Sequence, residues 1–251
     1  MEKNNIQINS FSAATKAMIL AAGLGTRLKP WTDRHPKALA LVNGKPLLQR
    51  NIEYLQQYGI REIVVNVHHF AEQVISAIAD NNGWGSNVTI SHEADEPLET
   101  GGGLLKAAEM LKGNTIVLIN VDILTDLNLG AMLQFHFDKK PLATLATTNR
   151  KTSRYFLFDN DNKLCGWKNE NTGETKSSAP LSGNETAKAF SGIHVIDPKI
   201  FSLINQTGKF SIVDVYMELM KTETILSFDH SESKFIDVGK PESIVKAEKM
   251  F

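Results

Sequence analysis

The segment best suited to binding an anion is Gly23-Leu-Gly-Thr-Arg27, which directly follows an apolar run. Glycines permit a left-handed backbone and let main-chain N–H groups approach a phosphate closely. Arg27 adds a planar fork of donors, and Lys37, in Pro36-Lys37 ten residues later, adds a compact charge. A glycine loop with two cations in so short a stretch predicts a triphosphate site. A bare Gly-x-Gly alone would more often be an ordinary strand-to-helix turn.

Other phosphate and catalytic motifs do not fit this sequence. Leu28 stands where the dinucleotide fingerprint needs its third glycine, which disfavours a nicotinamide-dependent dehydrogenase. A Walker loop would need Gly-Lys-Ser or Gly-Lys-Thr, and no Gly-x-Ser-x-Gly elbow is present. The pair His68-His69 lacks a third ligand at zinc-like spacing and is interpreted as structural or cleft-lining.

Two aspartates are candidate metal ligands. Asp122 ends Asn120-Val121-Asp122 after the most apolar predicted strand, and Asp237 lies in Phe235-Ile-Asp237-Val-Gly239. Ligands bind open α/β sheets at the carboxyl ends of the strands, and Mg²⁺ favours one or two carboxylates with phosphate oxygens and water. The alternatives are a helix cap for Asp122, a task for which Asp126 is better placed, and a turn residue for Asp237.

Three consecutive glycines end the string Pro97-Leu-Glu-Thr-Gly-Gly-Gly103. Each glycine costs conformational entropy on folding, so stability does not explain them. The sequence predicts that they precede a helix and let a flat or charged group lie against bare backbone at its N-terminus. A flexible loop is the alternative.

The elements that must position these residues alternate between strand and helix up to residue 140. Apolar runs and one-sided apolar periodicity predict the following pieces. Strands are expected at 16–22, 62–67, 88–91 and 115–121, and helices at 46–58, 71–79, 103–111 and 129–137. Beyond Pro141, short strands are expected at 142–148, 155–159, 164–167, 189–196 and 224–228, with helices at 212–220 and 241–249.

This order predicts an α/β fold with a Rossmann-like, mostly parallel sheet flanked by helices. The second half is expected to add strands over the carboxyl edge of that sheet. Residues 1–15 are predicted to be a loose extension and 16–251 a single domain, since no linker or internal repeat divides them.

Charge and composition exclude several classes of protein. The 251 residues contain 27 Lys and Arg against 28 Asp and Glu, a net charge of −1, which argues against nucleic-acid or membrane-surface binding. The longest apolar run, Ala17 to Ala22, is too short to span a bilayer, and residues 1–15 lack the apolar stretch of a signal peptide. A single cysteine, Cys165, allows no internal disulfide. We therefore expect a cytoplasmic protein.

The motifs together resemble the sugar-1-phosphate nucleotidyltransferases. The resemblance rests on the run from Ala17 to Pro30, on Pro36-Lys37, Gly44-Lys-Pro-Leu-Leu48, Pro97 to Gly103, Asn120 to Asp122, Phe190-Ser-Gly-Ile-His194 and Asp237-Val-Gly239. It covers residues 16 to 251. It implies the nucleotide-diphospho-sugar transferase fold, with a nucleotide half at about 16–140 and a sugar half at about 141–251. It also implies an Mg²⁺-dependent enzyme that joins a nucleoside triphosphate and a sugar 1-phosphate, as a monomer or small homo-oligomer.

The resemblance also implies roles for individual residues. The implied catalytic residues are Arg27, Lys37 and Asp122, and the implied Mg²⁺ ligands are Asp122 and Asp237. The implied nucleotide-binding residues are Leu20, Ala22, Gly23, Gly25, Thr26, Arg27, Glu93, Pro97, Thr100 and Gly101. Lys168, Ser191 and Gly192 would bind the sugar phosphate.

Resemblance to particular members of the family indicates candidate substrates. The string Glu96-Pro-Leu-Glu-Thr-Gly-Gly-Gly103 is most similar to uridylyltransferases acting on N-acetylmuramate 1-phosphate, a cell-wall sugar, and compact mannose-1-phosphate guanylyltransferases are nearly as similar. Val121 replaces a glycine common before the metal-binding aspartate, and Glu99 departs from the family's Pro-Leu-Gly-Thr-Ala-Gly. A catalytically silent, nucleotide-sugar-sensing subunit is a further alternative.

Overall fold

The main sheet contains ten strands and organises residues 14–251, the part of the chain that this computed structural model describes. The predicted extension at 1–15 lies outside the described residues except for its last two positions. The strands of the main sheet are β1 (Thr15–Leu20), β4 (Glu62–Val67), β5 (Asn87–His92), β6 (Thr115–Asn120), β8 (Ala143–Thr148), β9 (Arg154–Phe158), β10 (Leu164–Asn169), β11 (Thr175–Ser177), β12 (Thr186–Ile196) and β13 (Ile225–Asp229). Two small ribbons pair β2 (Leu41–Val42) with β3 (Lys45–Pro46) and β7 (Ile123–Thr125) with β14 (Phe235–Asp237).

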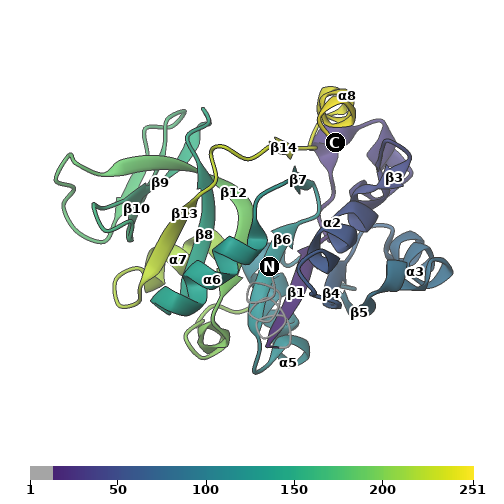
Figure 1. Cartoon of the computed structure of the whole chain (residues 1–251), viewed down its shortest axis with the longest axis horizontal. Coiled ribbons are helices and arrows are strands. Elements are labelled where there is room, and N and C mark those ends of the chain that lie inside the picture. The colour runs from purple at the N-terminus through teal and green to yellow at the C-terminus, as the bar shows by residue number, and fades with distance from the viewer. Residues whose placement is uncertain (1–13) are drawn as a thin grey trace, which may run out of the picture.

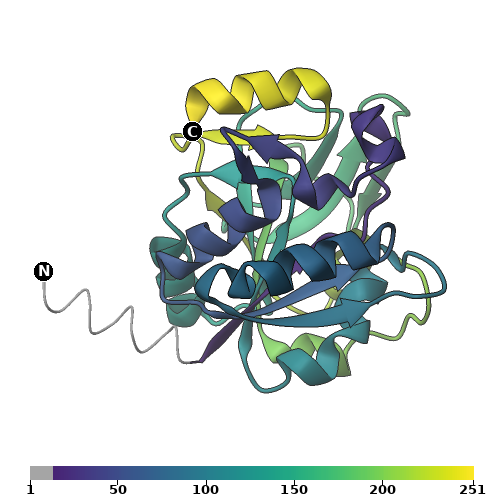
Figure 2. The same ribbon diagram turned by 90° about the vertical axis from the view of Figure 1, so that its right-hand side faces the viewer.

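Helices cover the sheet. They are α2 (Leu47–Gln56), α3 (Ala71–Asp80), α4 (Glu99–Lys106), α5 (Ala108–Leu111), α6 (Leu129–Lys139), α7 (Ile212–Leu219) and α8 (Pro241–Met250). Figure 2 shows the C-terminal helix α8, in yellow, above the strands at one side of the molecule. Within residues 14–251, no helix combines the length and apolar composition needed to cross a bilayer.

The first half of the chain forms a parallel sheet, as predicted. Strands β5, β4, β1 and β6 lie side by side in that order, and each neighbouring pair is parallel. Parallel strands need crossover connections, and α2, α3 and the pair α4 and α5 provide them here. The carboxyl ends of β1, β4 and β6 therefore meet at one edge, where a ligand site is expected.

The second half extends this sheet sideways rather than lying over its carboxyl edge. Strand β12 pairs antiparallel with β6, and β8, β9 and β10 continue the sheet through antiparallel pairing. In Figure 1 this green part of the sheet lies at the opposite end of the molecule from β4 and β5. The long strand β12 serves both parts because its first residues pair with β9 and its last with β6.

Both faces of the sheet are buried, which explains the continuous apolar runs in the strands. Along β1, Ala17 and Ile19 belong to the core cluster that contains α2, α3 and α6. Met18 and Leu20 belong to the opposite cluster, which contains α4, α5 and α7. Successive side chains of a strand point to opposite faces, so an all-apolar strand requires helices on both sides.

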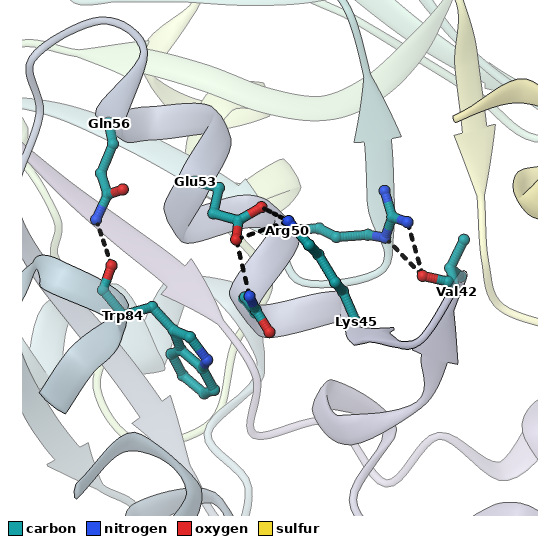
Figure 3. Close-up of polar contacts among 7 residues, drawn as sticks. Val42, Lys45, Arg50, Glu53, Gln56 and Trp84 are labelled. Carbon is teal, nitrogen blue, oxygen red and sulfur yellow. Dashed lines mark hydrogen bonds and ion pairs between the residues drawn. The ribbon is translucent and has the colours of Figure 1, made fainter. Parts of the chain in front are cut away.

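Polar side chains near both ends of helix α2 connect it to neighbouring segments (Figure 3). Arg50 donates from Nε and Nη2 to the carbonyl of Val42, at 2.9 and 2.7 Å. Lys45 forms an ion pair with Glu53 at 2.8 Å, and Gln56 donates to the carbonyl of Trp84 at 2.8 Å. These contacts fix the position of a helix whose Asn51 side chain reaches the end of β6.

Two sequence predictions about helix ends are wrong. The helix predicted at 103–111 begins at Glu99 and is interrupted at Ala107, so the three glycines lie inside the helix, at its third to fifth positions. The cap of α6 is Asn128, whose side chain accepts from the backbone N–H of Ala131, rather than Asp126. Asp126 instead accepts from the backbone N–H of Lys234.

Histidine 194 is fully buried in the core, and this predicts a pH-dependent stability. Its Nδ1 hydrogen-bonds to the hydroxyl of Tyr216 at 2.7 Å, and burial lowers its pKa from 6.5 to about 3. Below pH 6.5 the unfolded chain binds a proton that the folded chain does not, so the free energy of unfolding falls as pH falls toward 3. We expect His194→Gln to make this fall shallower between pH 6.5 and 5, by about 0.7 kcal/mol per pH unit at pH 6.5 and approaching about 1.4 kcal/mol per pH unit at pH 5.

The control is Tyr216→Phe, which removes the hydrogen bond and keeps the imidazole. It should lower stability at every pH and leave the slope against pH unchanged. The measurement is urea unfolding at several pH values. Equal slopes for wild type and His194→Gln would contradict the assignment.

Candidate active site

A cavity of about 550 Å³ opens at the carboxyl ends of β1, β4 and β6. This is the edge at which the sequence predicts a ligand site. Eleven of the predicted residues line it, and they come from the first half of the chain. They are Leu20, Ala22, Gly23, Gly25, Thr26, Arg27, Lys37, Glu93, Pro97, Thr100 and Asp122.

The loop after β1 folds tightly over Lys37. Gly25 has φ +62°, and a Cβ there would lie 2.9 Å from Cγ2 of Thr32 and 3.0 Å from Cβ of Lys37. The hydroxyl of Thr32 donates to the carbonyl of Gly25 at 3.0 Å, which closes the turn. By contrast, a Cβ at Gly23 would meet no atom within 4 Å, so its bare backbone faces open space at the cavity.

Two cation–carboxylate pairs lie at and beside the cavity. Arg27, Lys37 and Asp122 line it, whereas the predicted metal ligand Asp237 does not. Lys37 contacts Asp122, with both side chains almost buried, at 11 and 14% exposure. Arg27 lies 3.7 Å from Asp237, and both side chains are about half exposed. A side chain at Gly239 would collide with Asp237 and with Nη2 of Arg27, so this glycine allows the two charges to meet.

Asp122 and Asp237 are brought together by the ribbon of β7 and β14. Asp237 pairs with Ile123, and the backbone N–H of Val238 donates to the carbonyl of Asp122 at 2.8 Å. Burial and the adjacent charge of Asp122 raise the pKa of the Asp237 carboxyl, against the opposing influence of Lys37 and Arg27. The two carboxyl groups therefore crowd negative charge into one place.

This arrangement fits a divalent cation that is only partly coordinated by protein. Two adjacent carboxylates are ligands that Mg²⁺ prefers, and a cation would relieve their repulsion. Residues 14–251 contain no group of three or more His, Cys, Asp or Glu that could hold a metal. Phosphate oxygens and water would have to complete the coordination of an ion at Asp122 and Asp237.

The peptide before Asp122 is held from helix α2. The Asn51 side chain is buried, and its Nδ2 donates to the carbonyls of Leu47 and Val121, each at 2.9 Å. Asn51 thus links α2 directly to the residue that precedes Asp122. The fastening of α2 seen in Figure 3 therefore contributes to placing this carboxylate.

The far end of the cavity is organised by Asn66 and Glu93. Oδ1 of Asn66 accepts from the backbone N–H of Ala21, and its Nδ2 donates to Oε1 of Glu93, each at 2.7 Å. Oε2 of Glu93 accepts from the backbone N–H of Leu98 at 2.7 Å. Glu93 lines the cavity as predicted, but both of its oxygens are engaged in holding the loop before α4.

The three glycines of α4 serve close packing rather than an exposed backbone surface. Gly101 and Gly102 donate their N–H groups to the carbonyl of Phe210, and a Cβ at Gly101 would lie 2.5 Å from the Phe210 ring. A Cβ at Gly102 would lie 2.2 Å from the carbonyl oxygen of Gly208. At Gly103 it would lie 2.7 Å from Oε1 of Glu93. The expectation that a ligand lies against these glycines is wrong, and Gly101 does not line the cavity.

Some cavity residues were missed from sequence. Asn66 could have been suspected, because it is the one polar residue in the apolar run Ile63 to Val67. Lys209 and Ser211 reach the cavity from the loop before α7 and give no motif signal. Glu99 lines the cavity with φ +61°, a left-handed conformation that is strained for a residue with a side chain.

The three residues predicted to bind the sugar phosphate differ in how they lie relative to the cavity. Gly192 has φ +73° and approaches Asn120, a cavity residue, so closely that a Cβ would lie 2.7 Å from Nδ2. Ser191 is buried, and its hydroxyl hydrogen-bonds to Nε2 of His230 at 2.8 Å. Lys168 does not line the cavity, and its ammonium is 3.0 Å from Glu170.

Comparison with known proteins matches most of the chain. A model of the nucleotidyl transferase family matches residues 16–251. An N-acetylmuramate alpha-1-phosphate uridylyltransferase from Neisseria meningitidis serogroup B is 42% identical over 119 residues, 47% of this chain and 52% of that protein. One of the same description from Caulobacter vibrioides is 28% identical over 240 residues, 92% of this chain and 95% of that protein.

A solved structure is similar over nearly its whole length. The crystal structure of HddC from Yersinia pseudotuberculosis complexed with GMP-PN has a TM-score of 0.75 and 26% identity, and the match covers 94% of this chain and 99% of that one. For three of the curated relatives, the matched region makes up only 52 to 62% of their length.

Proposed function

Because the chain belongs to the nucleotidyl transferase family, we propose that it transfers a nucleotidyl group from a nucleoside triphosphate to a sugar 1-phosphate. The products are a nucleoside-diphosphate sugar and pyrophosphate. The observation that supports this most strongly is the charge cluster at and beside the cavity, where the carboxylate pair Asp122 and Asp237 meets the cations Lys37 and Arg27. This charge pattern suits two polyanions brought together with a divalent cation.

The proposed reaction is an in-line displacement. An oxygen of the sugar phosphate forms a bond to the α-phosphorus, and the bond from that phosphorus to the oxygen bridging it to the β-phosphate breaks. Pyrophosphate leaves with the bonding electron pair. The attacking oxygen is already anionic, so the step needs no general base and no covalent enzyme intermediate. Catalysis then consists of positioning and charge neutralisation.

Each residue at the floor has a proposed task. Arg27 binds the β- and γ-phosphates and stabilises the departing pyrophosphate. Lys37 exchanges its contact with Asp122 for the α-phosphate or the sugar phosphate. Asp122 and Asp237 hold the metal. Bound Mg²⁺ would supply charge neutralisation and polarise phosphate oxygens.

The backbone of the loop after β1 accounts for the rest of the triphosphate site. We propose that the N–H groups of residues 22–26 surround the triphosphate, since this loop presents bare backbone at Gly23. Pro97 and Thr100, with Leu20 and Glu93, line the part of the cavity assigned to base and ribose. Ser191 and Gly192 lie on the sugar side.

We divide the chain functionally into a nucleotide half at about 16–140 and a sugar half at about 141–251. The distribution of cavity residues supports this division, because all but Lys209, Ser211 and Gly239 come from the first half. We place the reaction in the cytoplasm, where nucleoside triphosphates are available. We propose a monomer or small homo-oligomer, without nucleic-acid or membrane partners.

The favoured substrates are UTP and N-acetylmuramate 1-phosphate, a reaction of cell-wall sugar metabolism. The 42% identity to the Neisseria uridylyltransferase supports this choice. GTP with a sugar 1-phosphate such as mannose 1-phosphate is the second candidate, because a structural relative was solved with GMP-PN.

A small substrate matrix tests the proposal. The four nucleoside triphosphates are each combined with the α-1-phosphates of N-acetylmuramate, mannose, glucose and N-acetylglucosamine, and pyrophosphate release is measured with Mg²⁺. We expect the highest rate with UTP and N-acetylmuramate 1-phosphate, a loss of at least about 100-fold with EDTA, and recovery when Mg²⁺ is restored in excess. A GTP and mannose signal would identify the second candidate. No release in any combination, with nucleotide binding retained in calorimetry, would favour a silent sensing subunit.

A further inference from the structure

Arg150 is a cation close to Asp237 that has no task in the proposed reaction. It lies two residues beyond β8, in the half assigned to the sugar. Its Nη2 donates to the carbonyl of Phe190 at 2.6 Å, and its guanidinium carbon lies 5.0 Å from the centre of the Phe235 ring. The exposed Arg150 side chain is therefore held by a hydrogen bond to β12 and by its contact with the Phe235 ring in β14, the strand that ends at Asp237.

The charge of Arg150 interacts with that of Asp237, one of the two active-site carboxylates. Partial burial lowers the pKa of the guanidinium, and the charges of Asp237 and Tyr155 raise it. Asp237 also forms the ion pair with Arg27. Arg150 is therefore a further positive charge near Asp237, contributed by the second half of the chain.

A buried polar side chain with an unused atom lies beside Arg150. His230 is only 5% exposed, and its Nε2 hydrogen-bonds to Ser191, while its Nδ1 has no partner among residues 14–251. Its ring centre lies 5.8 Å from that of Phe235, the ring beneath Arg150. Burial, with the positive charge of Arg150 as a smaller contribution, lowers its pKa to about 4, so the imidazole is neutral at neutral pH.

The guanidinium of Arg150 has N–H donors that form no hydrogen bond within the described residues. A guanidinium has five N–H donors, and within the described residues the carbonyl of Phe190 is the acceptor that Arg150 uses. Lys168, the cation expected on the sugar side, is turned to Glu170 and does not line the cavity. Among the described residues, Lys209 is the cation that the second half brings to the cavity lining, and it lies in the loop that contacts α4. Arg150 is not in that lining either, but it lies close to Asp237.

We propose that Arg150 binds an anionic group of the sugar substrate, with its fork of free donors directed at that group and His230 and Ser191 forming the polar wall beside it. The inference rests on the proposed function. Arginine suits this task because its planar donors match two oxygens of a phosphate or a carboxylate. N-acetylmuramate 1-phosphate has both groups, the 1-phosphate and the carboxylate of its lactyl ether.

Calorimetry with three ligands tests the proposal and separates the two sources of charge. Each ligand is titrated into the full chain saturated with Mg²⁺ and a non-hydrolysable UTP analogue. The ligands are N-acetylmuramate 1-phosphate, N-acetylglucosamine 1-phosphate, which lacks the carboxylate, and N-acetylmuramate, which lacks the phosphate. We expect Arg150→Gln to lower the affinity for N-acetylmuramate 1-phosphate by about ten- to a hundred-fold, as the loss of a charge-assisted hydrogen bond does.

The pattern across ligands identifies the group. If the affinities for both sugar phosphates fall equally, Arg150 binds the phosphate. If only the affinities for N-acetylmuramate 1-phosphate and N-acetylmuramate fall, Arg150 binds the carboxylate. Arg150→Lys should recover part of the affinity, since it restores charge without the fork. Lys151→Gln removes the neighbouring exposed charge and should leave all affinities unchanged.

A structural role predicts a different pattern. If Arg150 served only to hold Phe190 and Phe235, Arg150→Gln would lower the melting temperature and weaken the UTP analogue as much as the sugar. Unchanged sugar affinity in a folded Arg150→Gln protein would overturn the proposal. Failure of the proposed function is separate, because the wild-type chain would then release no pyrophosphate and would bind none of the three ligands.

Discussion

Asp122→Asn is expected to reduce pyrophosphate release by at least about 10³-fold. The substitution keeps the shape of the side chain and removes the charge that, with Asp237, would bind the metal. It also removes the ion-pair partner of Lys37 at a nearly buried position, with Asp237 left as the nearby acidic charge. We therefore expect the free energy of unfolding to fall as well, by about 1 to 3 kcal/mol, with part of the cost offset because Asp237 loses a repulsive neighbour.

The measurement is kcat at saturating Mg²⁺ and substrates, together with urea unfolding. Asp126→Asn is the matched control, since Asp126 is an exposed aspartate four residues further along that accepts from the backbone N–H of Lys234. Its turnover should stay within about twofold of wild type. A folded Asp122→Asn protein with near-normal turnover would remove Asp122 from the proposed machinery.

Gly102→Ala is expected to lower the free energy of unfolding by at least about 3 kcal/mol. The new Cβ would lie 2.2 Å from the carbonyl oxygen of Gly208 and 3.0 Å from the Cβ of Leu98, so backbone must move. The displaced segment includes Lys209 and Ser211, which line the cavity. Nucleotide affinity should therefore fall together with stability.

The control for this substitution is Gly23→Ala, where a Cβ would meet no atom within 4 Å. Its free energy of unfolding should change by less than about 1 kcal/mol. Chemical unfolding and titration with a non-hydrolysable UTP analogue measure the two effects. Stability of Gly102→Ala equal to that of Gly23→Ala would show that the contact between α4 and residue 208 is not as close as described.

Most elements of the fold could be predicted because their signal is local. The strand predicted at 62–67 and the helix predicted at 71–79 follow directly from an apolar run and a one-sided apolar pattern, and the structure confirms both, with the helix ending one residue later at Asp80. The ribbon of β7 and β14 gave no such signal, since each strand has three residues and exists through pairing with the other. Pairing between segments more than a hundred residues apart leaves no periodicity in either.

The interpretation of the glycines near residue 101 was wrong for a related reason. Sequence alone shows that no side chain is present, but not what occupies the space. Here Phe210, Gly208 and Glu93 occupy it, and two of them belong to a loop more than a hundred residues away. Lys168, predicted on the sugar side, is a similar case, because its ammonium forms an ion pair with the nearby carboxylate of Glu170.

The sequence by itself determined the parallel first half of the sheet, the glycine loop after its first strand, and the residue types at the floor of the cavity. Those follow from local periodicity and from the chemistry of Arg27, Lys37 and Asp122. The resemblance already implied Asp122 and Asp237 as a pair, and the tertiary structure places them side by side. Only that structure decided that Asn51 holds the peptide before Asp122 and that Arg150 stands near Asp237 while Lys168 pairs with Glu170. Each of these depends on how distant segments pack, and packing geometry is a property of the folded chain as a whole.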